Sequence, residues 1–397
     1  MPNHATPFWY LGIVSAFSLL TFDLYQPALP AITQYFNTTQ ALGQLTLSLF
    51  FLVFGLSQLI WGPLIDHFGR KNTLRISLVI FVFATMVCIF STTIEMLIAG
   101  RIAQGFAVCC SNIVAFSSSR DYGDSTDRAK IISHITMIVA VSPIFAPLIG
   151  SLIFLEFGWH AIFIFMIILA LFIFLLISRL LSESPVWQKP QQKIQLRHSV
   201  ANYRKLFGNS QLWLGILIVT ASFSCILAVI VNAAYLVIDY LNHSPLFFSL
   251  AFACNGLMLI LGNYVGIRLR DKKSLAWNIH LGSLLMVFGS LIMLMLFLFI
   301  GLNMLSLSPL LLIAFGVSII SPPAFSLVLA DYEHQAATAT AFINTARMVI
   351  SSIVASLISV FIITDIKLLP ISLLFCSLIC WIVSLFITET RVKIPKI

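Results

Sequence analysis

The chain has 397 residues, of which 60% are hydrophobic and only 9% are charged, with 22 Lys and Arg against 14 Asp and Glu and a net charge of +8. Soluble domains carry roughly 25% charged and 45–50% apolar residues, so this composition excludes an ordinary soluble enzyme. A helix that crosses a bilayer needs about 20 predominantly apolar residues. The roughly 238 apolar side chains therefore predict an integral membrane protein with about twelve spans.

Long apolar stretches that are interrupted by Gly, Pro and charged residues give the expected spans. In chain order they are 8–30, 42–63, 73–91, 95–118, 131–155, 161–181, 211–238, 246–267, 275–298, 308–330, 338–363 and 368–388. Residues 182–210 hold most of the polar residues near the midpoint and have the composition of a linker. We therefore expect an all-α membrane protein with domains at 1–181 and 211–397, joined by a cytoplasmic linker at 182–210.

The distribution of basic residues predicts the orientation, because Lys and Arg in short loops are retained on the cytoplasmic side. With the amino terminus inside, 19 of the 22 Lys and Arg residues fall on the cytoplasmic side, and Lys367 alone falls outside. The remaining two, Arg101 and Arg347, lie within spans. We expect both termini to be cytoplasmic and the basic residues to mark loops rather than a nucleic-acid surface.

Asp23 is the only acidic residue deep within a span. An ionisable group at this depth usually faces a cavity or a partner, so Asp23 is interpreted as a carboxyl that takes up and releases a proton during a transport cycle. The alternative is a carboxylate held permanently by a basic neighbour. At 1.5 Å per residue, Asp23 and Arg101 lie about 8 and about 9 Å below the outer face, so the two side chains can meet.

Several other polar groups within spans are candidates for lining a substrate cavity. Arg347 lies about 14 Å from the inner face and is either an electropositive element of the cavity or coupling network, or a structural donor to carbonyl groups. Gln104 lies one turn from Arg101, and Tyr25 lies beside the proline-rich end of the first span. Asn112 and Asn232 can contact substrate or join helices by hydrogen bonds. No sequence spacing indicates a metal site or a cofactor.

The loop between the second and third spans reads Gly62-Pro-Leu-Ile-Asp66-His-Phe-Gly69-Arg70-Lys71. We expect Gly62 to allow close helix approach and Gly69 to allow a tight turn, while Asp66 faces a helix amino terminus and Arg70 pairs with an acid. The loop resembles the signature G-x-x-x-D-[RK]-x-G-R-[RK] of the major facilitator superfamily, with His67 in place of the first basic residue. The resemblance implies that this loop, including Lys71, forms a cytoplasmic gate.

Three further motifs resemble the proton-driven drug antiporters of that superfamily, of the bicyclomycin-resistance type. These are Arg101-x-x-Gln104-Gly105 in the fourth span, Asp23-Leu-Tyr25-Gln-Pro27-Ala-Leu-Pro30 in the first span and Ser142-Pro143-Ile-Phe-Ala-Pro147-Leu-Ile-Gly150-Ser151 in the fifth span. The last resembles the antiporter motif, although Ala146 and Ser151 replace its commoner glycines. The resemblance implies two six-helix bundles that rock around a central cavity.

The expected function is proton-coupled export of amphipathic small organic molecules, that is, multidrug efflux across the inner (cytoplasmic) membrane by a monomer without enzymatic activity. Its partners would be substrate, protons and lipid. A dedicated exporter of an endogenous metabolite such as a siderophore, or a proton-driven importer, is the alternative. A non-transporting sensor or scaffold would lack a proton site, and an ATP-driven pump would need a P-loop that this chain does not contain.

Overall fold

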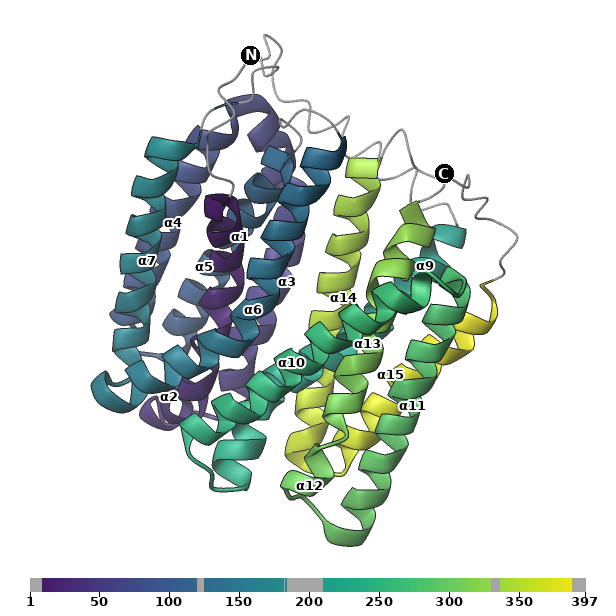
Figure 1. Ribbon diagram of the computed structural model, residues 1–397. Coiled ribbons are helices and arrows are strands. Elements are labelled where there is room, and N and C mark those ends of the chain that lie inside the picture. Colours follow the sequence, from purple (N-terminus) through teal and green to yellow (C-terminus); the bar gives the residue numbers. More distant parts are fainter. Residues whose placement is uncertain (1–8, 120–124, 182, 184–209, 330–335, 388–397) are drawn as a thin grey trace. The chain divides into compact units, whose positions relative to one another are not determined.

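The structure is a computed structural model that describes residues 9–119, 125–181, 183, 210–329 and 336–387. All regular structure in these residues is helical (Figure 1). The described helices belong to two compact units, of which the first holds α1 to α7 with residues 245–250, and the second holds the remaining described residues from 210 onward. Most of the predicted linker 182–210 lies outside the described residues, so the predicted domain boundaries at 181 and 211 stay a prediction.

The first unit contains α1 (Trp9–Asp23), the 3-10 turn η1 (Gln26–Ala28), α2 (Leu29–Tyr35), α3 (Gln40–Phe68), α4 (Arg70–Ile89), α5 (Ile94–Ser118), α6 (Ser125–Phe157) and α7 (Trp159–Leu180). The chain continues with α9 (Ser210–Ala234), the π-helical turn η3 (Tyr235–Tyr240), α10 (Pro245–Arg270), α11 (Leu275–Ile300), α12 (Met304–Leu307), α13 (Leu310–Leu329), α14 (Ala336–Thr364) and α15 (Leu368–Leu385).

Among the described residues, 11 helices are long and apolar enough to cross a membrane. They coincide with the predicted spans from the second to the twelfth, because each predicted stretch lies on one of these helices or extends it by a few residues. Apolar length alone therefore located these spans correctly. The chain is a multi-pass membrane protein.

The first predicted span, 8–30, is wrong as a single helix. α1 ends at Asp23 after 15 residues, and the chain continues through η1 into α2, which ends at Tyr35. Proline has no backbone N–H, so Pro27 and Pro30 cannot donate to the carbonyl groups four residues earlier. Those carbonyls belong to Asp23 and Gln26, and the helix is interrupted next to the deepest acidic residue of the chain.

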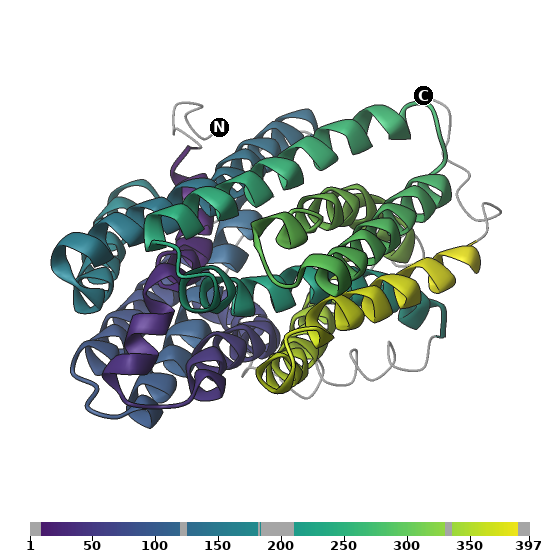
Figure 2. The same ribbon diagram turned by 90° about the horizontal axis from the view of Figure 1, so that it is seen from below.

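Within the first unit, α5 packs against α1, α3 and α4, and α1 also packs against α6. The end-on view of Figure 2 shows the purple and blue helices of this unit gathered side by side. Aromatic side chains fill the space between them, as in the edge-to-face pair of Phe17 and Phe81, whose ring centroids are 4.9 Å apart. α5 is thus a central helix of its unit, and Arg101 on it is fully buried.

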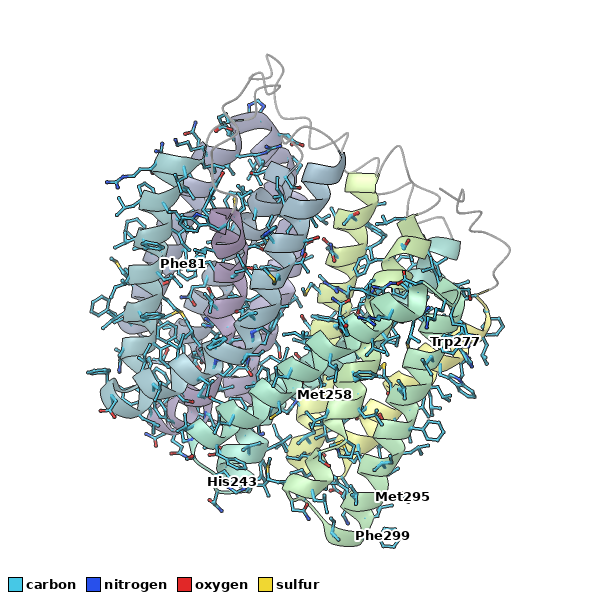
Figure 3. All side chains as sticks on the ribbon, viewed as in Figure 1. Phe81, His243, Met258, Trp277, Met295 and Phe299 are labelled. Carbon is cyan, nitrogen blue, oxygen red and sulfur yellow. The ribbon has the colours of Figure 1, made fainter. Side chains whose placement is uncertain are left out.

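Within the second unit, α11 packs against α13 and α15, and α9 packs against α14. Gly282 of α11 and Gly316 of α13 face one another so closely that a Cβ on Gly316 would lie 2.6 Å from the carbonyl oxygen of Gly282. Trp277 and Phe299 lie near opposite ends of α11 (Figure 3), where aromatic side chains commonly mark the two membrane interfaces.

Candidate functional site

The interruption after α1 places a buried carboxyl group among polar side chains. Asp23 is the last residue of α1 and is 1% exposed. The side-chain amide of Gln26, in η1, donates from Nε2 to Asp23 Oδ1 at 2.7 Å. The second carboxyl oxygen, Oδ2, is buried and has no hydrogen-bond partner among the described residues. A buried carboxylate is costly unless its charge is compensated, so this is a group that gains from binding a proton.

Arg101 of α5 lies between two aromatic rings. Its guanidinium carbon is 4.5 Å from the ring centroid of Tyr25 and 4.5 Å from that of Phe50. Nη1 donates to Gln104 Oε1 at 2.8 Å and to the backbone oxygen of Thr21 at 3.4 Å. Nε and Nη2 are buried and have no hydrogen-bond partner. The cation is therefore held mainly by ring faces and neutral acceptors.

Two chains of hydrogen bonds fix this arrangement. Gln104 Nε2 donates to the Thr85 hydroxyl at 2.8 Å, and that hydroxyl donates to the carbonyl oxygen of Phe81 at 2.6 Å. The Tyr25 hydroxyl lies 3.1 Å from Thr46 Oγ1, whose own proton goes to the carbonyl oxygen of Gly43 at 2.6 Å. Since a threonine hydroxyl has one proton, Tyr25 is the donor to Thr46. The chains connect α5 to α4, and the interruption after α1 to α3.

Asp23 and Arg101 lie in one cluster with Tyr25, Gln26 and Gln104. Within this cluster they do not form an ion pair. Arg101 contacts the backbone of Thr21 and the ring of Tyr25, which flank Asp23 in the sequence. The carboxyl group accepts its hydrogen bond from Gln26. In the described part of the chain, neither its second oxygen nor Nε and Nη2 of Arg101 has a hydrogen-bond partner. The alternative interpretation from the sequence, a carboxylate fixed by a basic neighbour, therefore does not describe this structure.

The antiporter-like segment of α6 lies against this cluster. Pro143 and Pro147 are both inside the helix, and a Cβ on Gly150 would collide with the backbone carbonyl of Leu24, the residue after Asp23. The carbonyl oxygen of Pro147 accepts a hydrogen bond from the Ser249 hydroxyl at 2.8 Å. Because Gly150 has no side chain, the backbone of α6 can contact the backbone of the chain where α1 is interrupted.

In the gate-like loop, residues 62–71, the structure contains the turn expected at Gly69 but not the close helix approach expected at Gly62. Gly69 has φ of 84° between α3 and α4, which confirms the expected turn. The role expected of Gly62 is wrong, because a Cβ there would meet nothing within 4 Å. Asp66 lies in the last turn of α3 and is exposed, whereas Arg70 and Lys71 begin α4.

Glu183 is a residue at this loop that the sequence reasoning missed. Its carboxylate accepts the backbone N–H of Arg70 at 2.8 Å and of Lys71 at 2.9 Å, so it caps the first turn of α4. A Cβ on Gly69 would lie 2.7 Å from Glu183 Oε1, which gives Gly69 a second reason to lack a side chain. The only signal in the sequence was an acid just after a span, 112 residues from Lys71.

The other predicted cavity residues lie apart from this cluster. Asn112 Nδ2 donates to the Ser15 hydroxyl at 3.5 Å, between α5 and α1. In the second unit, Asn232 Nδ2 donates to the carbonyl oxygen of Ala228 at 2.7 Å and to the Ser359 hydroxyl at 3.0 Å, which joins α9 to α14. These contacts are of the kind that holds helices together.

Arg347 of α14 belongs to a separate cluster in the second unit. Its guanidinium carbon lies 4.5 Å from the ring centroid of Phe223 in α9 and 5.2 Å from that of Phe325 in α13. Arg347 Nε is buried and has no hydrogen-bond partner. In the part of each unit that the structure describes, one arginine thus lies over two aromatic rings.

The polar groups described in the two units each have a definite chemical character. A carboxyl with one unpartnered oxygen can be protonated without the loss of a salt bridge, and the two arginines offer unsatisfied donors. Among the described residues, no group of three or more His, Cys, Asp and Glu side chains could hold a metal ion. The described groups are thus a buried carboxyl and two arginines with unpaired N–H groups.

The chain as a whole is similar to known proteins. A family model described as Major Facilitator Superfamily matches residues 11–356. An uncharacterized MFS-type transporter of Bacillus subtilis, YdgK, is 27% identical over 369 residues, which cover 88% of this chain and 87% of that protein.

Two relatives are named for multidrug resistance. Multidrug resistance protein D of Escherichia coli is 28% identical over 200 residues, which are 50% of each protein. Multidrug resistance protein MdtL of Citrobacter koseri is 33% identical over 162 residues, which cover 41% of this chain and 42% of MdtL. The chain thus matches about half the length, or less, of these two relatives.

The fold is similar to solved transporter structures. The xylose transporter XylE of E. coli, in a partially occluded inward open conformation, aligns with a TM-score of 0.74 at 16% identity and covers 97% of this chain and 99% of that one. A POT family transporter in complex with a thioalcohol-conjugated peptide aligns with a TM-score of 0.77 at 12% identity over 95% of this chain and 94% of that one. At these identities the likeness concerns the fold alone.

Proposed function

The chain belongs to the major facilitator superfamily, whose members are transporters and not enzymes, and from this premise we propose that it is a proton-coupled exporter of amphipathic small organic molecules. The relatives named for multidrug resistance support efflux. The proposal places the chain in the bicyclomycin-resistance branch, in the inner membrane with both termini cytoplasmic, and as two six-helix bundles with twelve spans, the interrupted segment α1–η1–α2 being the first.

The surroundings of the Asp23 carboxyl group are the main support for proton coupling. Its carboxyl is buried, one oxygen is unpartnered, and it lies where the helix is interrupted. Binding a proton removes a desolvated charge, and losing it restores a charge that the side-chain amide of Gln26 stabilises through its hydrogen bond. Such a group changes its charge with the conformation around it, which is what coupling to a proton gradient needs.

The energy available from one proton is sufficient for concentrative export. One pH unit corresponds to about 1.4 kcal/mol, and a membrane potential of 100 mV supplies about 2.3 kcal/mol per charge moved. Together they supply about 3.7 kcal/mol, which allows a substrate gradient of several hundredfold at one proton per substrate.

We predict that Asp23→Asn abolishes proton coupling and keeps ligand exchange, because the amide retains the shape of the carboxyl but cannot cycle a proton. The measurement uses proteoliposomes loaded with the pH indicator pyranine. Proton flux is recorded after addition of ethidium, dansylglycine or dansylglycinamide, and isotope or dye exchange is recorded without a pH gradient. Asp23→Asn should reduce ligand-dependent proton flux to that of protein-free liposomes.

Asp239→Asn is the matched control, because Asp239 is an exposed acid at the end of the first helical span of the second unit. It should leave proton flux unchanged. Undiminished flux in Asp23→Asn would remove Asp23 from the mechanism. A wild-type protein that moves no proton with any amphipathic probe, and responds only to a metabolite such as a siderophore, would favour a dedicated exporter.

A further inference from the structure

Arg347 has no role in the cluster around Asp23, and its surroundings indicate a ligand. Its partners in the described part of the chain are the rings of Phe223 and Phe325, and no hydrogen bond or ion pair involves its guanidinium there. Ring faces attract a cation but leave its N–H groups without acceptors. A guanidinium in a membrane span is costly in this condition, so residues of this kind usually face a partner or a water-filled path.

One edge of the guanidinium is accessible. Among the described residues Nε has no hydrogen-bond partner, and it is fully buried. Neither Nη1 nor Nη2 is both fully buried and unpaired in this way. Since neither Nη atom has a hydrogen bond, both retain some exposed surface, and the residue as a whole is partly buried. The guanidinium carbon lies over both rings, and ring faces accept no conventional hydrogen bond, so the donors at the Nη edge remain for an incoming acceptor.

Among the described residues of the second unit, no acid lies close enough to neutralise Arg347. Within its spans the only acidic residue is Asp239, at the end of η3. The hydrogen bond of 3.0 Å between Ser224 and Ser351 sets the two helices in register. Asp239 lies 15 residues beyond Ser224, and Arg347 lies 4 residues before Ser351, so the two charges are about 28 Å apart along the helices at 1.5 Å per residue.

We propose that Arg347, held between Phe223 and Phe325, binds the carboxylate or sulfonate of the transported molecule. The preferred substrates are then amphipathic organic anions or zwitterions, whose apolar or aromatic part contacts the two rings. The guanidinium fork suits a planar carboxylate, with which it forms two parallel hydrogen bonds. This inference rests on the proposed function, since it names the class of molecule that is exported.

The test is equilibrium binding to the full-length protein in lipid nanodiscs without a pH gradient. Three probes carry the same fluorophore and differ in charge: dansylglycine is an anion, dansylglycinamide is neutral and dansylethylenediamine is a cation. Fluorescence titrations are corrected with empty nanodiscs. The variants are Arg347→Gln and Arg347→Lys, with Arg268→Gln as the matched control, because Arg268 lies at the exposed end of α10.

The wild type should bind dansylglycine about tenfold more tightly than dansylglycinamide, which corresponds to about 1.4 kcal/mol. Arg347→Gln should abolish this ratio, Arg347→Lys should retain part of it because the charge remains and the planar fork is lost, and Arg268→Gln should retain all of it. A wild type that does not prefer the anion overturns the proposal without any variant. An unchanged ratio in a folded Arg347→Gln protein also overturns it.

The two proposals fail separately. If Asp23→Asn keeps the preference for dansylglycine, recognition of the anion is independent of the proton site, as we expect. Loss of proton flux in the wild type together with an intact binding ratio would remove only the proton coupling. Intact flux with equal binding of all three probes would remove only the assignment of Arg347.

Discussion

At the scale of single residues, the candidate proton site depends on how closely two backbones approach. Gly150 of α6 lies against the carbonyl of Leu24, directly after Asp23. This contact connects the antiporter-like segment to the interruption in the first span. The position of the Asp23 carboxyl therefore depends on Gly150, a residue that has no side chain.

We predict that Gly150→Ala destabilises the protein by about 1–3 kcal/mol, the usual range for overpacking, and also reduces ligand-dependent proton flux. The added methyl group would collide with the Leu24 carbonyl and displace α6 or the end of α1. Thermal unfolding of purified protein and the pyranine assay measure the two effects. Gly62→Ala is the control, because a Cβ at Gly62 meets nothing within 4 Å, and equal effects of both substitutions would contradict the proposed contact.

The burial of Asp23 and the turn at Gly69 agree with the sequence, and both residues have a local signal. Asp23 stood out as one acid in a long apolar run, and Gly69 as the glycine of a turn. The partners of Arg347 could not be predicted, because the chain contains 34 Phe residues and nothing local distinguishes Phe223 or Phe325 from the others. The close helix approach expected at Gly62 was inferred from the residue type alone, whereas in the structure a Cβ placed there would meet nothing within 4 Å.

At the scale of secondary-structure elements, α4 begins at a cap that comes from far along the chain. Glu183 accepts the N–H groups of Arg70 and Lys71, so the first turn of α4 is fixed by a residue just beyond α7. α4 and α7 also pack against one another. Apolar length predicted both helices, but a contact between residues more than 100 positions apart has no local signature.

We predict that Glu183→Ala lowers stability by about 0.5–2 kcal/mol, the range measured for the loss of helix caps. Glu183→Gln should have a smaller effect, because the amide oxygen still accepts one N–H while the charge at the helix amino terminus is lost. Thermal unfolding compares the variants. Glu156→Ala, an exposed acid near the end of α6, is the control, and a decrease as large as that of Glu183→Ala would contradict the capping role.

At the scale of the whole molecule, the proposed transport cycle requires that the loop between α3 and α4 form and break contacts. The gate role of this loop is a proposal that rests on its family signature. Its geometry is set by Gly69 and by the Glu183 cap, both of which lie in the first unit.

We predict that Arg70→Ala and Asp66→Asn reduce turnover roughly tenfold with little change in equilibrium ligand affinity, since coupling between sites is typically 1–3 kcal/mol. Both residues lie at the end of a span, whereas the candidate binding groups lie within spans. Turnover is measured as ligand-dependent proton flux, and affinity is measured in nanodiscs. Reduced affinity with normal turnover would assign this loop to ligand binding instead of gating.

The length of α11 has a consequence for any reconstituted preparation. Trp277 and Phe299 are 22 residues apart, or about 33 Å along the helix axis, and all of α11 measures about 39 Å. A hydrocarbon layer about 30 Å thick is thinner than both lengths. The segment between the two aromatic residues therefore slightly exceeds such a layer, and lipids with shorter acyl chains increase this difference, which helices accommodate by tilting or by thickening the bilayer locally. Acyl-chain length is thus an experimental variable that affects the packing of α11 against α13 even in the absence of substrate.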